Sequence, residues 1–206
     1  MKQSKYRWIA VAATCCMCLM VGCAKFPAHR VGTCQWQDIP RLAHRVPVCY
    51  TVRRIDGGLV VHDYRGAEER YVRDLLVKSV AFESVSSQET SGCLSLSIEF
   101  EDRYPTSVGS TMSVFASLFT LTVIPARWQT DLTLRVDVKN GAGAVTHYEY
   151  TDSVVNWMWI GLFFTGSQID DVTPAVEQNM FRTFLRDLAS DVGGGGGAKR
   201  GPVIKL

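Results

Sequence analysis

The amino-terminal stretch decides which part of the chain can contribute to a fold. Lys2, Lys5 and Arg7 precede an almost uninterrupted run of apolar and small residues from Trp8 to Val21. This layout is typical of a secretory signal peptide, which is removed and does not belong to the folded domain. The run comprises about 14 residues, whereas a transmembrane helix needs about 20. We therefore assign residues 1–22 to a signal peptide.

The end of this stretch carries a second motif, Leu19-Met20-Val21-Gly22-Cys23. It resembles the lipobox of bacterial lipoproteins, in which a small residue precedes the cysteine that becomes lipidated. Three other cysteines, Cys15, Cys16 and Cys18, have no Gly or Ala directly before them, so Cys23 is the predicted lipid attachment site. Two alternatives stay open: an uncleaved anchor, and a signal peptide that is cleaved nearby without lipidation.

The resemblance implies an anchor and a location. A diacylglyceryl thioether and an amide-linked acyl chain, such as palmitate, on Cys23 would hold the chain at a membrane, since each buried methylene contributes about 0.8 kcal/mol. Ala24 follows the cysteine. By resemblance to sorting in enteric bacteria, this residue favours the outer membrane, with the protein facing the periplasm. Removing the three signal-peptide cations from a chain of net charge +2 leaves −1, which gives no reason to expect a nucleic-acid partner.

The mature chain retains Cys34, Cys49 and Cys93. An envelope location permits disulfides, and a Cys34–Cys49 bridge would close a short loop and stabilise the fold by about 3 kcal/mol. Cys93 then remains as a buried thiol in an alternating strand, although other pairings stay open. The histidines and cysteines show no paired ligand spacing, so we expect no metal site and no cofactor.

The remaining chain predicts a tether and lead-in over residues 23–47, a single α+β domain over 48–192 and a disordered Gly-rich tail over 193–206. Asp56-Gly57 separates two short strands, and Asn140-Gly141 separates two longer ones, which predicts two hairpins. Apolar residues recur at helical spacing in two segments, from about residue 65 to 80 and from Thr173 onward. The apolar face of the second helix comprises Val176, Met180, Phe181, Phe184, Leu185 and Leu188. We expect one mostly antiparallel sheet with two amphipathic helices packed on one face.

Two further segments, residues 111–124 and 154–164, are more apolar than a half-exposed strand requires. One interpretation is that they are central strands or buried loops of the core. The other is a docking patch for a partner protein or the bilayer interface. Of these two, a partner protein is favoured, because a chain already anchored by lipid gains little from a second membrane contact. The predicted patch comprises Trp157, Met158, Trp159, Leu162, Phe163 and Phe164.

The chain offers no motif for catalysis such as Gly-x-Ser-x-Gly, His-Glu-x-x-His or a phosphate-binding glycine loop. His147 and Glu149 share a strand face, but no third group is identifiable that would orient them, so a solvated sheet face explains them better. We therefore expect a non-enzymatic, lipid-anchored envelope protein that acts as an accessory or structural subunit through contacts with an envelope protein. The alternative is a binding protein that shelters a lipid or other apolar ligand between sheet and helices. An exposed Trp157 and Trp159 over a closed core would favour the first, and an internal apolar cavity the second.

Overall fold

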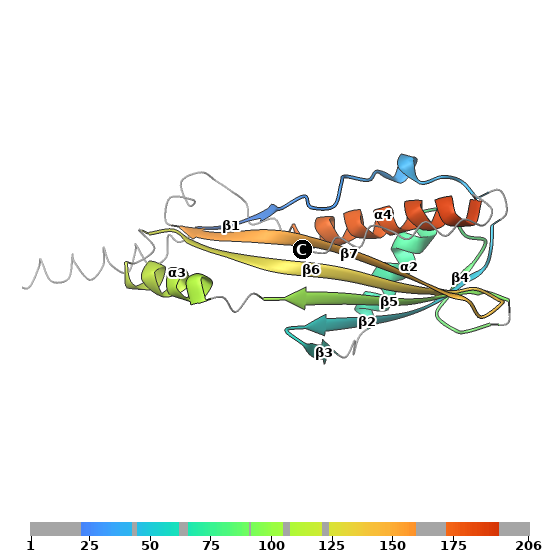
Figure 1. Cartoon of the computed structure of the whole chain (residues 1–206), viewed down its shortest axis with the longest axis horizontal. Helices are drawn as coiled ribbons and strands as arrows, with labels where there is room; N and C mark the ends of the chain where they lie inside the picture. Colours follow the sequence, from blue (N-terminus) through green and yellow to red (C-terminus); the bar gives the residue numbers. More distant parts are fainter. Residues whose placement is uncertain are drawn as a thin grey trace, which may run out of the picture. The chain divides into compact units, whose positions relative to one another are not determined.

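The computed structural model describes residues 22–42, 45–61, 66–90, 92–104, 108–120, 124–159 and 172–193 (Figure 1). Its strands are β1 (Gly22–Pro27), β2 (Val48–Asp56), β3 (Leu59–Val61), β4 (Val85–Ser86), β5 (Leu94–Arg103), β6 (Ala126–Lys139) and β7 (Val145–Trp159). Its helices are the 3-10 turn η1 (Trp36–Asp38), α2 (Ala67–Lys78), α3 (Val108–Phe119) and α4 (Thr173–Gly193). The predicted signal peptide before Gly22, the tail after Gly193 and the patch residues Leu162, Phe163 and Phe164 lie outside the described residues.

The chain divides into two compact units. Unit 1 comprises Met1–Pro27, Tyr104–Thr130 and Val154–Val172, so it contains β1, α3, the start of β6 and the end of β7. Unit 2 comprises Ala28–Arg103, Asp131–Ser153 and Thr173–Leu206. The strands belong to one seven-stranded sheet with the order β1-β7-β6-β5-β2-β3, and β4 pairs with β2.

The sheet of unit 2 is mixed. β2 runs parallel to β5, with Val48 opposite Leu94 and Asp56 opposite Asp102. The chain passes through β3, α2 and β4 between these two strands, and a crossover of that kind returns the chain in the same direction. β5 pairs antiparallel with β6, and β2 with β3, around the predicted turn at Gly57-Gly58. The α+β class is confirmed, whereas the prediction of a mostly antiparallel sheet is wrong.

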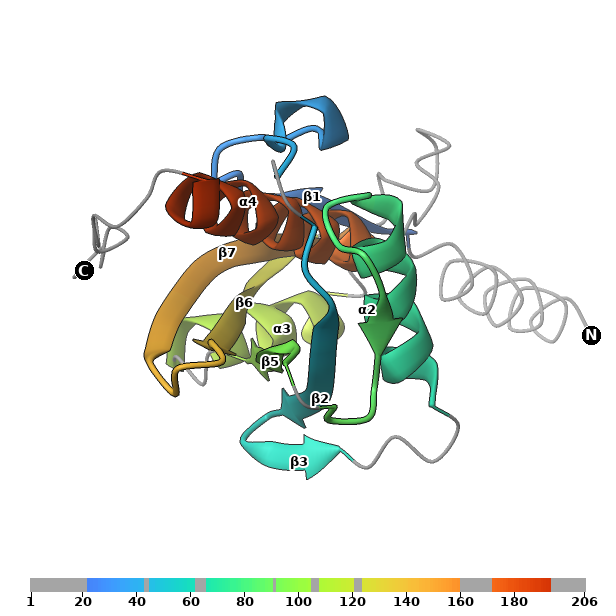
Figure 2. The same cartoon turned by 90° about the vertical axis from the view of Figure 1, so that its right-hand side faces the viewer.

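Figure 2 shows the helices α2 and α4 of unit 2. Both helices bury apolar residues. Tyr71 of α2 contacts Phe100 of β5 at 6.4 Å between ring centroids, and Tyr148 of β7 contacts Phe184 of α4 at 5.4 Å. The predicted apolar face of the last helix is confirmed, because all six of its residues are buried: Val176, Met180, Phe181, Phe184, Leu185 and Leu188. Val80 lies at the end of the segment predicted to be helical, but it follows the end of α2 and is 60% exposed.

Unit 1 contains two elements that differ from those expected from the sequence. β1 lies where an irregular tether was expected, and it pairs antiparallel with the end of β7. α3 lies where a central strand or buried loop was expected, so the described part of the chain has three α-helices rather than two. The residues Val108, Met112, Phe115 and Phe119 recur at helical spacing, which a composition rich in Val, Thr and Phe concealed. Among the described residues, no helix is both long and apolar enough to span a bilayer.

Candidate functional site

The predicted lipid attachment residue is part of a strand. Cys23 pairs with Met158, and Ala24 pairs with Trp157. The thiol of Cys23 is free and the residue is partly buried. The candidate anchor therefore sits at the beginning of a folded element, with no flexible segment between it and the protein body.

The residues after β1 are also held in place, within unit 2. The backbone N–H groups of Arg30 and Val31 donate to the Asp152 carboxylate at 3.0 and 3.4 Å. The backbone N–H of Cys34 donates to Asn179 Oδ1 at 2.8 Å. Asp152 is 2% exposed, so this carboxylate satisfies backbone donors that would otherwise lack a partner. The predicted irregular tether is therefore a segment that hydrogen bonds hold to the rest of unit 2 at Arg30, Val31 and Cys34.

An apolar groove in unit 1 is the main candidate site. Phe26, Pro125, Trp157 and Trp159 line an open groove of about 310 Å³. Phe26 is 51% exposed and Trp159 is 41% exposed. We call these four residues the aromatic groove. The patch predicted from the sequence includes both tryptophans but not Phe26 and Pro125, which lie far from them in the chain.

Strand pairing explains how the groove is assembled. Residues paired across two antiparallel strands place their side chains on the same face, and neighbours along a strand alternate between faces. Ala24, paired with Trp157, therefore shares a face with Phe26 and Trp159. Cys23 and Met158 belong to the opposite face. The structure thus joins Trp157 and Trp159 in one surface and separates Met158 from them.

α3 adds a second exposed apolar surface to unit 1. Met112, Phe115 and Phe119 are 65%, 55% and 87% exposed. They recur at i, i+3 and i+7, so they form one stripe along a helix that contains no charged residue. We call these three residues the α3 stripe. An amphipathic helix normally turns such a stripe toward the core, so its exposure marks an interaction surface.

Arg127 connects the two surfaces. Its backbone N–H donates to Ser113 Oγ of α3 at 3.1 Å. Its guanidinium lies over the Trp157 ring, with Cζ 5.6 Å from the ring centroid, and the residue is exposed. The aromatic groove is therefore bordered by a positive charge that is positioned by stacking on one of its own residues.

A partly buried ionic cluster lies in unit 2. Arg54 donates to Glu68 from Nε at 2.7 Å, and to Asp102 and Glu177 from Nη1 at 3.0 and 2.9 Å. Burial raises the pKa of Glu177 and of Asp102, and Arg54 opposes this shift in both. Because Arg54 belongs to β2, Glu68 to α2 and Glu177 to α4, the cluster ties both helices to the sheet. Its polar groups bind one another, which indicates a structural role.

The residues considered for acid–base chemistry have different partners. His147 Nδ1 lies 2.6 Å from Asp137 Oδ1, whereas Glu149 accepts from Arg135 Nε at 3.3 Å. Both His147 and Glu149 have exposed side chains. Within the described ranges, no group of three or more His, Cys, Asp or Glu residues is arranged to hold a metal ion.

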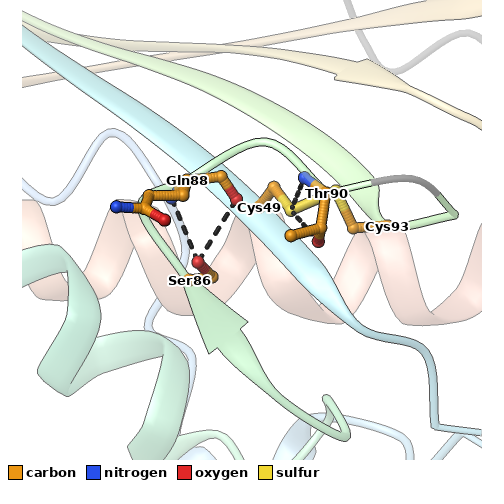
Figure 3. The surroundings of a disulfide bond; sticks show 5 residues. All are labelled: Cys49, Ser86, Gln88, Thr90 and Cys93. Carbon is orange, nitrogen blue, oxygen red and sulfur yellow. Dashed lines mark hydrogen bonds between the residues drawn. A yellow bond between two sulfur atoms is a disulfide. The ribbon is translucent and has the colours of Figure 1, made fainter.

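The disulfide differs from the predicted one. Cys49 is bonded to Cys93, with their Cα atoms 5.8 Å apart (Figure 3). Cys34 is a buried free thiol. The prediction of a Cys34–Cys49 bridge is wrong because the parallel register of β2 and β5 brings Cys93, directly before β5, beside Cys49. Burial raises the pKa of the Cys34 thiol, which keeps it protonated and weakly reactive.

Comparisons with known proteins add little. No protein-family model matches the chain. No curated protein matches it. Two solved structures are similar over much of their length. The first is rare lipoprotein B from Shewanella oneidensis, at 9% identity and a TM-score of 0.34; the aligned region covers 71% of this chain and 89% of that chain. A PelC dodecamer from Paraburkholderia phytofirmans, at 14% identity and a TM-score of 0.29, covers 84% of this chain and 97% of its own. Similarities at these values define neither a family nor a function.

Proposed function

We propose that this chain is a non-enzymatic, lipid-anchored protein of the bacterial envelope. Its anchor is Cys23, its location is the outer membrane on the periplasmic side, and it acts as an accessory or structural subunit through protein contacts. The lipobox resemblance supports the anchor. The domain proposed for these contacts carries two amphipathic helices, α2 and α4, over one face of its sheet.

The exposed edge strand β3 is the feature that best supports the proposed protein contacts. Its three residues Leu59, Val60 and Val61 are 75%, 53% and 45% exposed. In the described part of the sheet, β3 ends the strand order and has β2 as its neighbour on one side. An edge strand offers backbone donors and acceptors to another chain, and soluble proteins normally protect it with charge or proline. This apolar edge suits the addition of an extended segment from a partner protein.

The predicted docking patch is a second interaction surface, either for a partner protein or for the bilayer interface. Trp157 and Trp159 are its described aromatic members, together with Met158 on the opposite face; Leu162, Phe163 and Phe164 extend it in sequence. Apolar surface of this kind on a chain held at a membrane supports a docking role.

The aromatic groove also favours a second candidate, a periplasm-facing binding protein for a lipid or other apolar ligand. Its apolar lining is suited to an acyl chain. The space between the helices and the sheet, where such a ligand was first expected, is occupied by fully buried large side chains such as Phe100, Phe181 and Phe184. A ligand would therefore bind at the groove, and replacing Trp157 by a polar residue would weaken this binding.

The anchor is tested first, with the full chain and a Cys23→Ser variant expressed in a bacterial host fed with labelled palmitate. The expected result is label and membrane association in the first and loss of both in the second. Label that persists without Cys23, or that never occurs, contradicts the anchor.

The protein contact is tested by placing a photo-crosslinking amino acid at Val60. The matched control is the same amino acid at Val77 of α2, which is similarly exposed at 57%. A discrete protein adduct from position 60, and none from position 77, is the expected result. Equal patterns from both positions would show that β3 is not a specific contact.

A further inference from the structure

We infer that unit 1 rests on the lipid bilayer, with the α3 stripe and the aromatic groove at the interface of the membrane. The inference rests on the proposed lipidation of Cys23 and specifies what occupies the exposed apolar surface of unit 1. The occupant is the bilayer that the acyl chains of Cys23 enter, and not a protein.

The absence of a tether supplies the first argument. Because Cys23 is already paired with Met158 in a strand, the lipidated residue and the folded body begin at the same place. Phe26 lies three residues further, and a fully extended chain advances at most about 11 Å over that distance. The headgroup layer on each side of a bilayer is about 5–8 Å thick. An anchor at Cys23 therefore holds the aromatic groove in or directly beside the headgroup layer.

The chemistry of the groove fits that position. Tryptophan is enriched where membrane and water meet, because its ring is apolar and its N–H is polar. Arg127 supplies an exposed guanidinium over Trp157, at the border of the groove. A guanidinium pairs well with a phosphate oxygen, and phosphate is the negative group of a phospholipid headgroup. The guanidinium thus suits the phosphate groups of the headgroup layer, and the aromatic rings suit the apolar layer beneath it.

The α3 stripe extends this surface. A helix that lies in the interface inserts its apolar side about 5–10 Å into the boundary between headgroups and acyl chains. Phe119 is 87% exposed, and no residue of α3 is charged, so the helix has no charged side chain to oppose its transfer from water to this boundary. The bond from Arg127 to Ser113 and the stacking of Arg127 on Trp157 place α3 and the groove in one connected structure within unit 1.

Processing at Cys23 would enlarge the surface. Cleavage before Cys23 removes Gly22, which is the strand partner of Trp159. Trp159 is already 41% exposed, and its neighbour Met158 pairs with the acylated residue. The mature protein thus presents more aromatic surface next to its lipid than the precursor does.

The experiment uses depth-dependent quenching of tryptophan fluorescence in the full, lipidated chain. The protein is isolated from the envelope of a bacterial host that supplies labelled palmitate, and is reconstituted into phosphatidylcholine vesicles with or without bromine on the acyl chains. Two single variants are compared with the parent: Phe119→Trp in the α3 stripe and Leu59→Trp in β3. The two positions are matched because their side chains are 87% and 75% exposed, so both substitutions leave the core unchanged.

The expected result is an added loss of fluorescence in brominated vesicles for Phe119→Trp, and none for Leu59→Trp. Replacing Trp157 by Phe in the parent should reduce its quenching, whereas replacing Trp36 of unit 2 should not. Equal quenching at positions 119 and 59, in protein that carries the palmitate label and floats with the vesicles, overturns the inference and leaves the anchor intact. Such a result would assign the α3 stripe to a protein partner. Protein without label that does not float overturns both the inference and the proposed anchor.

Discussion

Replacing Arg54 by Met tests how the two helices are held to the sheet. Arg54 has a side chain that is 16% exposed and forms ion pairs with Glu68, Asp102 and Glu177. Methionine has a similar length and can keep the contact that the guanidinium makes with the Phe100 ring, where Cζ lies 5.3 Å from the centroid. The substitution therefore removes the charge while it preserves most of the packing.

The size of the effect follows from the groups that remain. Glu177 has a side chain that is 6% exposed, and after the substitution it lies near Asp102 and Glu68 without a counter-ion. Removing one partner of a buried ion pair costs about 3–5 kcal/mol, because the other charge stays desolvated. We expect the free energy of unfolding to fall by this amount at pH 7.5, as measured by urea denaturation followed by circular dichroism.

The pH dependence gives a signature that lost packing would not produce. Burial holds the pKa of Glu177 and Asp102 above its usual value, and Arg54 limits the shift in the wild type. A carboxyl group with a raised pKa binds more protons in the folded state than in the unfolded state, so its contribution to stability increases as the pH falls. Without Arg54 the shift is larger, so the loss of stability should be smaller at pH 5 than at pH 7.5. Adding Glu177→Gln should also restore part of the stability.

The matched control is Arg53→Met. Arg53 is the neighbour of Arg54 in β2, but its side chain is 60% exposed and pairs with Glu99 at the surface. Exposed pairs of this kind contribute about 0–1 kcal/mol. Equal losses for the two arginine variants, or a loss for Arg54→Met that does not change with pH, would refute the reasoning.

Three further changes are expected to alter stability. Cys93→Ser should lower the free energy of unfolding by about 4 kcal/mol, since the bridge to Cys49 spans 44 residues; peptide mapping that instead finds Cys34 bridged would contradict it. Val80→Gly should raise the free energy of unfolding by about 0.5–1 kcal/mol, because relief of a left-handed β-branched residue exceeds the entropy that glycine costs. Val80 has φ of 54° and is 60% exposed, and a lower thermal midpoint would refute this. Asp152→Ala should cost about 3 kcal/mol by leaving backbone donors unpaired, and unchanged hydrogen exchange at the Arg30 amide would argue against it.

Local patterns were sufficient for the elements whose own residues determine them. The last helix could be predicted because its buried residues recur every three or four positions over a long segment, and its face was confirmed down to Leu188. The β2–β3 hairpin could be predicted because Asp56-Gly57 is a tight-turn signal, and Gly57 and Gly58 both take positive φ at that turn. These signals are carried by neighbours in sequence, so tertiary contacts did not need to be known.

Arrangements set by distant residues could not be predicted in this way. Whether β5 runs parallel or antiparallel to β2 depends on the crossover through α2, and alternation within each strand looks the same in both cases. The wrong disulfide prediction has the same cause, because the pairing of the cysteines depends on the direction of β5 relative to β2. Proximity in sequence favoured Cys34 as the partner of Cys49, whereas the parallel register brings Cys93 beside Cys49, and Asn179 holds the Cys34 backbone elsewhere.

The candidate site shows the same limit most clearly. Its aromatic groove combines Phe26, Pro125 and the two tryptophans of β7, which come from three separated parts of the chain. The sequence identified the tryptophans by composition, but it grouped Met158 with them, although alternation along a strand places it on the other face. Phe26 was missed because residues after a lipidated cysteine are usually read as a spacer. The pairing of β1 with β7 removes that spacer, and the same pairing brings Phe26 to the tryptophans. The groove and the tetherless anchor are therefore one structural feature, so a change that prevents β1 from pairing should abolish both together.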